Sequence, residues 1–175
     1  MLSTRLRIFI SSPGDVSAAR EIAALTIERL AQDYARFFDV EPYLWEYEAM
    51  LASGHFEDSI EPPSAFDIVV LILWSRLGTP LPERTRVREY RGIDGRAPLT
   101  GTEWEFEEAL RAARERGVPD LLVYRSTAPV PVDSRDVGRR QQDIEQLTAL
   151  DRFWAQHFAN RGVFLGAYTE CATNA

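Results

Sequence analysis

The apolar run IVVLILW at positions 68–74 is the feature that most constrains the fold of this chain. Its residues are apolar at consecutive rather than alternating positions, which is typical of a strand covered on both faces, as in a parallel sheet with helices on each side. A membrane-spanning helix needs about 20 apolar residues, so the run is too short to cross a bilayer. We therefore expect residues 66–74 to form a buried strand of a parallel sheet.

Strand and helix patterns alternate along the rest of the chain. Further strands are expected at residues 6–10, 40–46, 120–125 and 162–168, and helices at 16–38, 102–116 and 136–160, with a short helical piece at 55–60. Pro42 cannot donate a ladder hydrogen bond, so the strand over 40–46 is expected at an edge. This order predicts an α/β fold with right-handed crossovers: a three-layer, flavodoxin-like, doubly wound parallel sheet of five strands.

The first two long helices carry apolar residues at helical spacing, so each is expected to pack one face on the sheet. Asp15 precedes the first helix and is expected to cap it. The expected buried positions are Val16, Ala23, Ile27, Leu30, Tyr34 and Phe37 in the first helix, and Phe106, Ala109, Leu110 and Ala113 in the second.

Composition narrows the class of protein. The 175 residues, of which 45% are hydrophobic and 27% charged, predict a single globular domain over residues 1–175, which we expect to be the N-terminal module of a larger protein. One cysteine, Cys171, and two histidines predict a cytoplasmic protein without a zinc site. The net charge of −7 argues against a nucleic-acid partner. Residues 84–96, with five arginines against two acids, are expected to form an exposed mobile loop.

Three polar segments are expected to meet at one edge of the sheet. In doubly wound sheets, ligands bind outside the carboxyl ends of the strands, where SSPGD (11–15) and WSRLGTPLP (74–82) follow strands and LTGTEWE (99–105) leads into a helix. Helix N-termini there favour anions. Neither G-x-G-x-x-G nor G-x-x-x-x-G-K-[ST] is present, which argues against a standard Rossmann dinucleotide-binding site and against a P-loop. The candidate substrate-binding residues are Ser11, Ser12, Asp15, Arg20, Trp74, Ser75, Arg76, Gly101, Thr102 and Trp104.

Glu105 has two interpretations. It can be the N3 residue of a capping box with Thr102 as N-cap, T-x-x-E. Alternatively, it lies near Ala109 on the small-residue edge of the buried stripe, where its carboxylate can point into the cleft and act on a developing cation or as nucleophile or base. Glu103 is the second candidate, and it can instead form a capping box with Thr100.

Arg20 and three tryptophans also stand out. Arg20 occupies the apolar face of the first helix, where a guanidinium needs a carboxylate or a phosphate as partner. Two interpretations of Arg20 are open: it forms an ion pair with Asp15, Glu46 or a glutamate of residues 102–116, or it binds a substrate phosphate. Trp45, Trp74 and Trp104 fall at expected element ends, where they either pack or stack on a nicotinamide or adenine ring.

The blocks RIFISSPGDVSAARE, FDIVVLILWSRLGTPLP and GTEWEFEEAL…DLLVYR resemble the TIR-like domain of unknown function that opens prokaryotic STAND-type NTPases with NACHT-like or repeat sensor regions. The chain is also similar, more distantly, to TIR domains and nucleoside 2-deoxyribosyltransferases. Their Gly-Thr turn, catalytic glutamate and following alanine are matched by Gly101, Thr102, Glu105 and Ala109. Leu99 and Thr100 stand where deoxyribosyltransferases often have an aspartate.

The resemblance implies an N-glycosidic bond hydrolase with Glu105 as catalytic residue. Its implied substrate is NAD or a related nucleotide, with no separate cofactor, and its implied setting is anti-phage immune signalling. The implied partner is the chain itself, which would self-associate through a fused sensor or NTPase region without contact to nucleic acid or membrane. The alternative is a non-catalytic oligomerisation module of a STAND NTPase, and a third possibility is 2-deoxyribosyl transfer.

Overall fold

A computed structural model describes residues 4–44, 61–81, 91, 95, 100–131, 136–158 and 168–171 of the chain. Four strands form the body of the sheet: β1 (Thr4–Ser11), β2 (Phe38–Tyr43), β3 (Ile68–Leu73) and β4 (Asp120–Ser126). A short strand, β5 (Tyr168–Cys171), pairs with the end of β4. The helices are α1 (Ser17–Asp33), α3 (Gly101–Arg116) and α4 (Val137–His157), with 3-10 turns at η1 (Gly14–Val16) and η3 (Pro63–Ala65).

The sheet is parallel and its strand order is β2-β1-β3-β4-β5. The parallel α/β arrangement expected from the sequence is confirmed. β3 lies between β1 and β4, which explains why its residues are apolar on both faces. β2 pairs with β1 and stands first in the order, so Pro42 lies on the outer strand as predicted.

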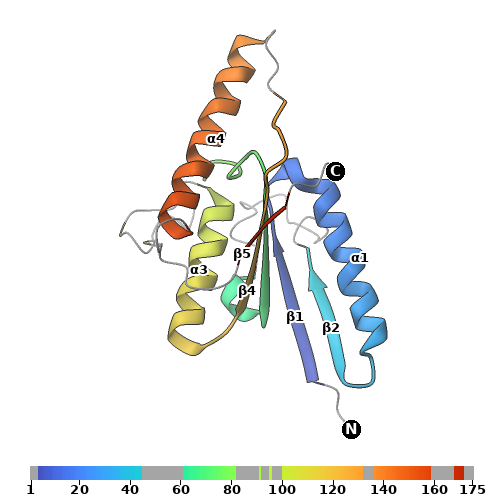
Figure 1. Ribbon diagram of the computed structural model, residues 1–175. Coiled ribbons are helices and arrows are strands. Elements are labelled where there is room, and N and C mark those ends of the chain that lie inside the picture. The colour runs from blue at the N-terminus through green and yellow to red at the C-terminus, as the bar shows by residue number, and fades with distance from the viewer. Residues whose placement is uncertain are drawn as a thin grey trace, which may run out of the picture.

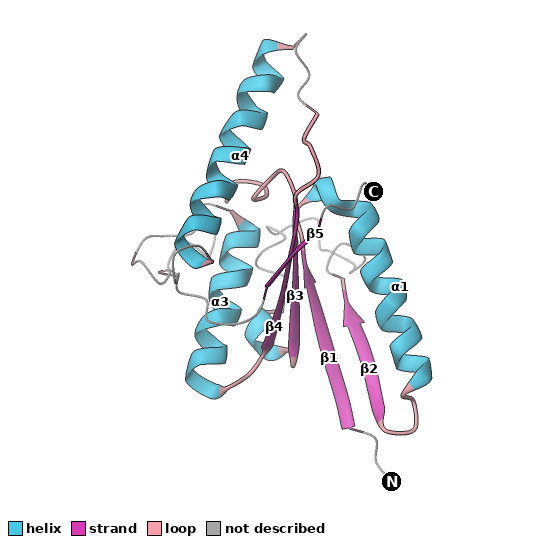
Figure 2. Cartoon of the chain, viewed as in Figure 1, coloured by secondary structure: helices cyan, strands magenta, loops and turns pink. Residues whose placement is uncertain are grey.

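Helices pack on both faces of the sheet (Figures 1 and 2). α1 lies on one face, where Ile27 packs with Ile10 and Val70. α3 and α4 lie on the opposite face, where Phe106 and Phe153 pack with Leu71 and other buried residues. Since successive strand residues point to opposite faces, each face takes alternate residues of β1 and β3.

The first helix is shorter than predicted. α1 ends at Asp33 rather than near residue 38, and Tyr34 to Phe38 form a turn in which the Tyr34 carbonyl accepts from the amides of Phe37 and Phe38. Only Val16 and Ile27 of the expected buried positions are buried, whereas Leu30, Tyr34 and Phe37 are exposed. The prediction of a continuous buried stripe to Phe37 was therefore wrong at its C-terminal end.

The second long helix is close to expectation. α3 spans Gly101–Arg116, and Gly117 closes it in the left-handed conformation with φ of 78°. Phe106, Ala109 and Leu110 are buried as predicted, whereas Ala113 is only partly buried. The expected helix at 55–60 and strand residues 162–167 lie outside the described residues, as does the arginine-rich loop at 84–96 apart from Arg91 and Gly95.

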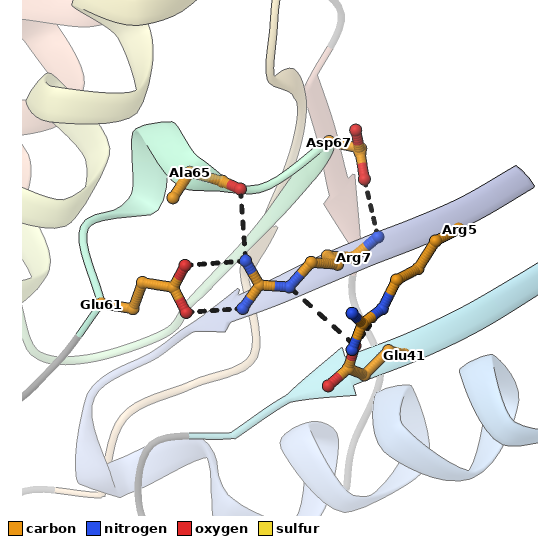
Figure 3. Close-up of polar contacts among 6 residues, drawn as sticks. All are labelled: Arg5, Arg7, Glu41, Glu61, Ala65 and Asp67. Atoms are coloured by element: carbon orange, nitrogen blue, oxygen red, sulfur yellow. Dashed lines mark hydrogen bonds and ion pairs between the residues drawn. The ribbon is translucent and has the colours of Figure 1, made fainter.

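A charged cluster fixes the segment before β3 to β1 (Figure 3). The Arg7 guanidinium donates to both carboxylate oxygens of Glu61, at 2.7 and 2.5 Å, and lies 4.4 Å above the Phe66 ring. The Arg7 amide donates to Asp67 Oδ2 at 2.8 Å. The hydrogen bond between the side chains raises the pKa of Arg7 and lowers the pKa of Glu61. This bidentate pair therefore favours both charged forms in the folded protein.

Within the described residues, none of the helices combines the length and apolar character that crossing a membrane requires.

Candidate functional site

Ser11 and Glu105 meet at the carboxyl edge of the sheet. Ser11 ends β1 and its Oγ donates a hydrogen bond of 2.6 Å to Glu105 Oε2 of α3. Ser11 is fully buried and Glu105 is 3% exposed. Ser11 lies on the same strand face as Phe9, which packs with Ala109 of α3, so the register of β1 aims the hydroxyl at this helix. The predicted meeting of the SSPGD loop with the N-terminal part of α3 is confirmed.

The cap of α3 differs from the first interpretation of Glu105. Thr100, not Thr102, is the N-cap, and its Oγ1 accepts from the Glu103 amide at 3.2 Å. The same hydroxyl donates to the Leu77 carbonyl at 2.9 Å. The capping box of Thr102 and Glu105 was therefore wrong, and the carboxylate of Glu105 faces β1 instead.

The loop after β3 approaches this helix start closely. Pro80 forms an isolated antiparallel bridge with Thr100, and Gly78 has a φ of 112°. A Cβ at Gly78 would lie 2.8 Å from Thr102 Oγ1. Only glycine fits this conformation and contact, so the LGTP sequence positions Thr102 and the first turn of α3.

Arg20 binds the SSPGD loop. Its Nε donates to Ser12 Oγ at 2.6 Å, and its Nη2 donates to the carbonyl oxygens of Ser12 and Pro13 at 3.3 and 3.0 Å. The loop thus supplies oxygen acceptors to a guanidinium that was expected to need a carboxylate or phosphate. Ser12 is itself buried, so in this structure its hydroxyl contacts Arg20 within the protein and is not presented to a ligand.

Asp15 joins the ends of β1 and β3. Its Oδ2 accepts from the Ser75 amide and hydroxyl at 2.9 and 2.8 Å. The prediction that Asp15 caps the first helix was wrong, because the N-cap residues are Pro13 for η1 and Val16 for α1. Within the described residues, Asp15 Oδ1 is buried without a hydrogen-bond partner. Trp74 donates from Nε1 to the Ala128 carbonyl at 2.9 Å.

Asp15, Trp74, Ser75 and Arg76 line a pocket of about 420 Å³. It lies where β1 and β3 adjoin and where the strand order reverses, the place at which doubly wound sheets bind ligands. The other lining residues come from the β4–α4 connection and from α4: Val130, Pro131, Arg139 and Asp143. A second pocket of about 420 Å³ shares Asp15, Trp74 and Pro131 with it. Neither set of lining residues includes Glu105 or Ser11.

The sequence analysis missed Arg139 and Asp143. They lie one helical turn apart near the start of α4, where Asp136 caps the Arg139 amide. Their spacing is a signal that they share a face of the helix. Which surface this face meets depends on the path of the preceding loop, so the sequence alone could not place them at the pocket.

Several other candidates are buried. Trp104 is 5% exposed, so its ring presents little surface to a ligand in this conformation. Thr102 is buried, and Gly101 is the first residue of α3. Glu103 is buried too and lines a different pocket, of about 580 Å³, with residues of α4. Trp45 lies outside the described residues.

His157 has an acidic neighbour from another helix, which its position in the sequence does not reveal. Its Nε2 lies 3.4 Å from Glu107 Oε1, and both side chains are fully buried beside Phe106 and Phe153. The pair joins the end of α4 to the first half of α3. In the described part of the chain, no cluster of three or more His, Cys, Asp or Glu side chains is arranged to hold a metal ion.

This edge of the sheet therefore holds two separate features: a buried carboxylate with a hydroxyl donor, and a polar pocket with an aromatic wall. A carboxylate of this kind can stabilise a cation or accept a proton, and the pocket has the size of a small-ligand site. Compared with known proteins, the chain matches no family model, and no curated protein or solved structure is significantly similar to it.

Proposed function

We propose that this chain is a TIR-like domain that cleaves the N-glycosidic bond of NAD or a related nucleotide, with Glu105 as its catalytic residue. The observation that carries the proposal is the hydrogen bond of 2.6 Å from Ser11 to Glu105, which places a carboxylate beside the switch point of the sheet. We also propose that the chain forms a single domain of three layers, with a flavodoxin-like sheet of five strands. The parallel order β2-β1-β3-β4-β5, with helices on both faces, supports it.

The proposed reaction breaks the bond between the nicotinamide nitrogen and C1′ of the ribose. The electron pair of this bond leaves with nicotinamide, which becomes neutral, and the sugar acquires oxocarbenium character. The negative charge of Glu105 stabilises this developing cation. Water then adds to C1′ and releases a proton, so the products are nicotinamide, ADP-ribose and H⁺.

Ser11 has a positioning role in this scheme. Its hydroxyl donates to Oε2 and thereby orients the carboxylate of Glu105. Because Glu105 is 3% exposed and lines neither pocket at this edge, the proposal requires a rearrangement that exposes its carboxylate to the substrate. We propose that self-association in the cytoplasm, driven by a fused sensor or NTPase region during anti-phage signalling, favours this rearrangement.

The test is nicotinamide release from NAD by the chain, free and tethered into oligomers. We expect release from the tethered wild type and a loss of at least about 100-fold in Glu105→Gln, since a positioned acid–base or electrostatic group contributes a factor of this order. Glu103→Gln is the matched control, because Glu103 lines another pocket. Loss of activity in Glu103→Gln alone would reverse the assignment, and a preference for deoxyribonucleosides would indicate the transferase reaction.

A second candidate function is a non-catalytic oligomerisation module. The observation that favours it is the apolar outer side of α1, where Ile22 is 64% and Leu25 is 63% exposed. These residues are three positions apart on one helix face, and exposed apolar groups of this kind mark interaction surfaces. Ile22→Glu with Leu25→Glu should then abolish self-association measured by sedimentation. Self-association without nicotinamide release would favour this second function.

A further inference from the structure

We propose that Arg76 and Arg139 together bind the diphosphate of the nucleotide, in the pocket of about 420 Å³ between the ends of β1 and β3 and the start of α4. This inference deepens the proposed function and rests on it for placing the ligand next to Glu105. The ligand class is a ribose-bearing nucleoside diphosphate. The assignment places the phosphates away from Arg20, for which a substrate phosphate was one of the two partners left open by the sequence.

The SSPGD loop already uses its polar groups for contacts within the protein. Ser11 donates to Glu105, and Ser12 accepts from Arg20. Both serines are buried. A phosphate at this loop would have to displace these contacts and reach buried hydroxyls, which makes the loop a poor anion site in the folded protein.

The pocket, by contrast, offers two available guanidinium groups. Arg76 follows β3 and Arg139 lies in the first turn of α4, and both line the pocket and are exposed. In the part of the chain that the structure describes, neither guanidinium takes part in a hydrogen bond or ion pair. Arginine binds phosphate oxygens through parallel N–H donors, and the N-terminal turn of a helix also favours an anion.

The remaining groups of the pocket match the rest of the ligand. The pocket carries two carboxylates as well, from Asp15 and Asp143, so bare charge does not make it an anion site. Asp15 is partly exposed and lines the pocket, so its carboxylate can accept a hydrogen bond from a ribose hydroxyl. Trp74 supplies an aromatic wall held by its bond to the Ala128 carbonyl. A ligand with hydroxyls, a ring and phosphates uses all of these groups, whereas inorganic phosphate uses only the arginines.

The experiment measures binding of ADP-ribose, which has no nicotinamide bond to cleave, by calorimetry. The variants are Arg76→Gln and Arg139→Gln. Arg29→Gln is the control, because Arg29 is an exposed arginine of α1 away from the pocket lining. We expect each pocket variant to weaken ADP-ribose binding by at least about tenfold, since hydrogen bonds to charged groups are of this strength. Arg29→Gln should bind within about twofold of wild type, because surface charges away from a site have small effects.

Inorganic pyrophosphate and ribose serve as partial probes, and each should bind more weakly than ADP-ribose. The inference is overturned if the wild type does not bind ADP-ribose, if both pocket variants bind it as the wild type does, or if Arg29→Gln weakens binding equally. Arginine-dependent ADP-ribose binding without nicotinamide release would keep this inference and remove the proposed function. Nicotinamide release that is unchanged in both pocket variants would keep the proposed function and overturn this inference.

Discussion

Ser11→Ala tests the contact on which the candidate site depends. The substitution removes the hydroxyl that donates to Glu105 Oε2 at 2.6 Å, and because both side chains are buried, water does not readily replace it. A hydrogen bond to a charged group contributes about 1.5–3 kcal/mol to the free energy of unfolding. For a chain of this size, the loss corresponds to a fall in Tm of about 3–12 °C.

The assay is urea and thermal unfolding of Ser11→Ala, Glu105→Ala and the double variant. Ser17→Ala is the matched control, since Ser17 is an exposed serine at the start of α1 and should change the free energy of unfolding by less than about 0.5 kcal/mol. We expect a coupling energy of about 1–3 kcal/mol between Ser11 and Glu105. Additive single substitutions, or a Ser11→Ala effect as small as that of Ser17→Ala, would refute the reasoning.

Two further predictions concern stability. Gly78→Ala should lower the free energy of unfolding, measured by denaturant titration, by about 1–3 kcal/mol, because Gly78 has a φ of 112° and the new Cβ would contact Thr102. Gly14 has open space around it, so Gly14→Ala should change the free energy of unfolding by less than about 1 kcal/mol. Glu61→Gln should cost about 0.2–1 kcal/mol at pH 7, since both partners of the Arg7 pair are partly exposed. The folded-state pKa of Glu61 is lowered from its ordinary value of 4.5, so the stabilisation by the ion pair is complete above that value and is lost as the pH falls through the folded-state pKa. Below this pKa, wild type and Glu61→Gln should have the same free energy of unfolding. A difference that persists in acid would contradict the assignment.

The sheet could be predicted because its signals are local. Consecutive apolar residues at 68–74 indicate a strand with two covered faces, and β3 indeed lies between β1 and β4. Pro42 indicates an outer strand, and β2 occupies that place. Both signals depend on backbone hydrogen bonding and burial, which are fixed by the residues themselves.

The end of α1 could not be predicted in the same way. Leu30, Tyr34 and Phe37 continue the helical spacing, and neither glycine nor proline marks a stop before β2. The helix ends because the chain must turn into β2, and the Tyr34 carbonyl accepts the amides of that turn. Spacing alone therefore extended the helix into a turn whose apolar residues are exposed.

The cap of α3 shows where sequence reasoning about the site reaches its limit. Two overlapping T-x-x-E frames, Thr100 with Glu103 and Thr102 with Glu105, are equivalent as patterns. The hydrogen bond from Thr100 to the Leu77 carbonyl, a contact across 23 positions, favours the first frame. Arg20 and Asp15 were likewise placed correctly at the SSPGD loop, but their hydrogen-bond partners depend on tertiary contacts that spacing does not encode.

The most direct measurement of the central claim is the ratio of nicotinamide release between the tethered wild type and tethered Glu105→Gln at saturating NAD, with folding of both verified by their Tm. We predict that the wild type releases nicotinamide and ADP-ribose in equal amounts and that the ratio of the two rates is at least about 100. A wild type that releases no nicotinamide in any tethered form, or a ratio near one, would contradict the central claim.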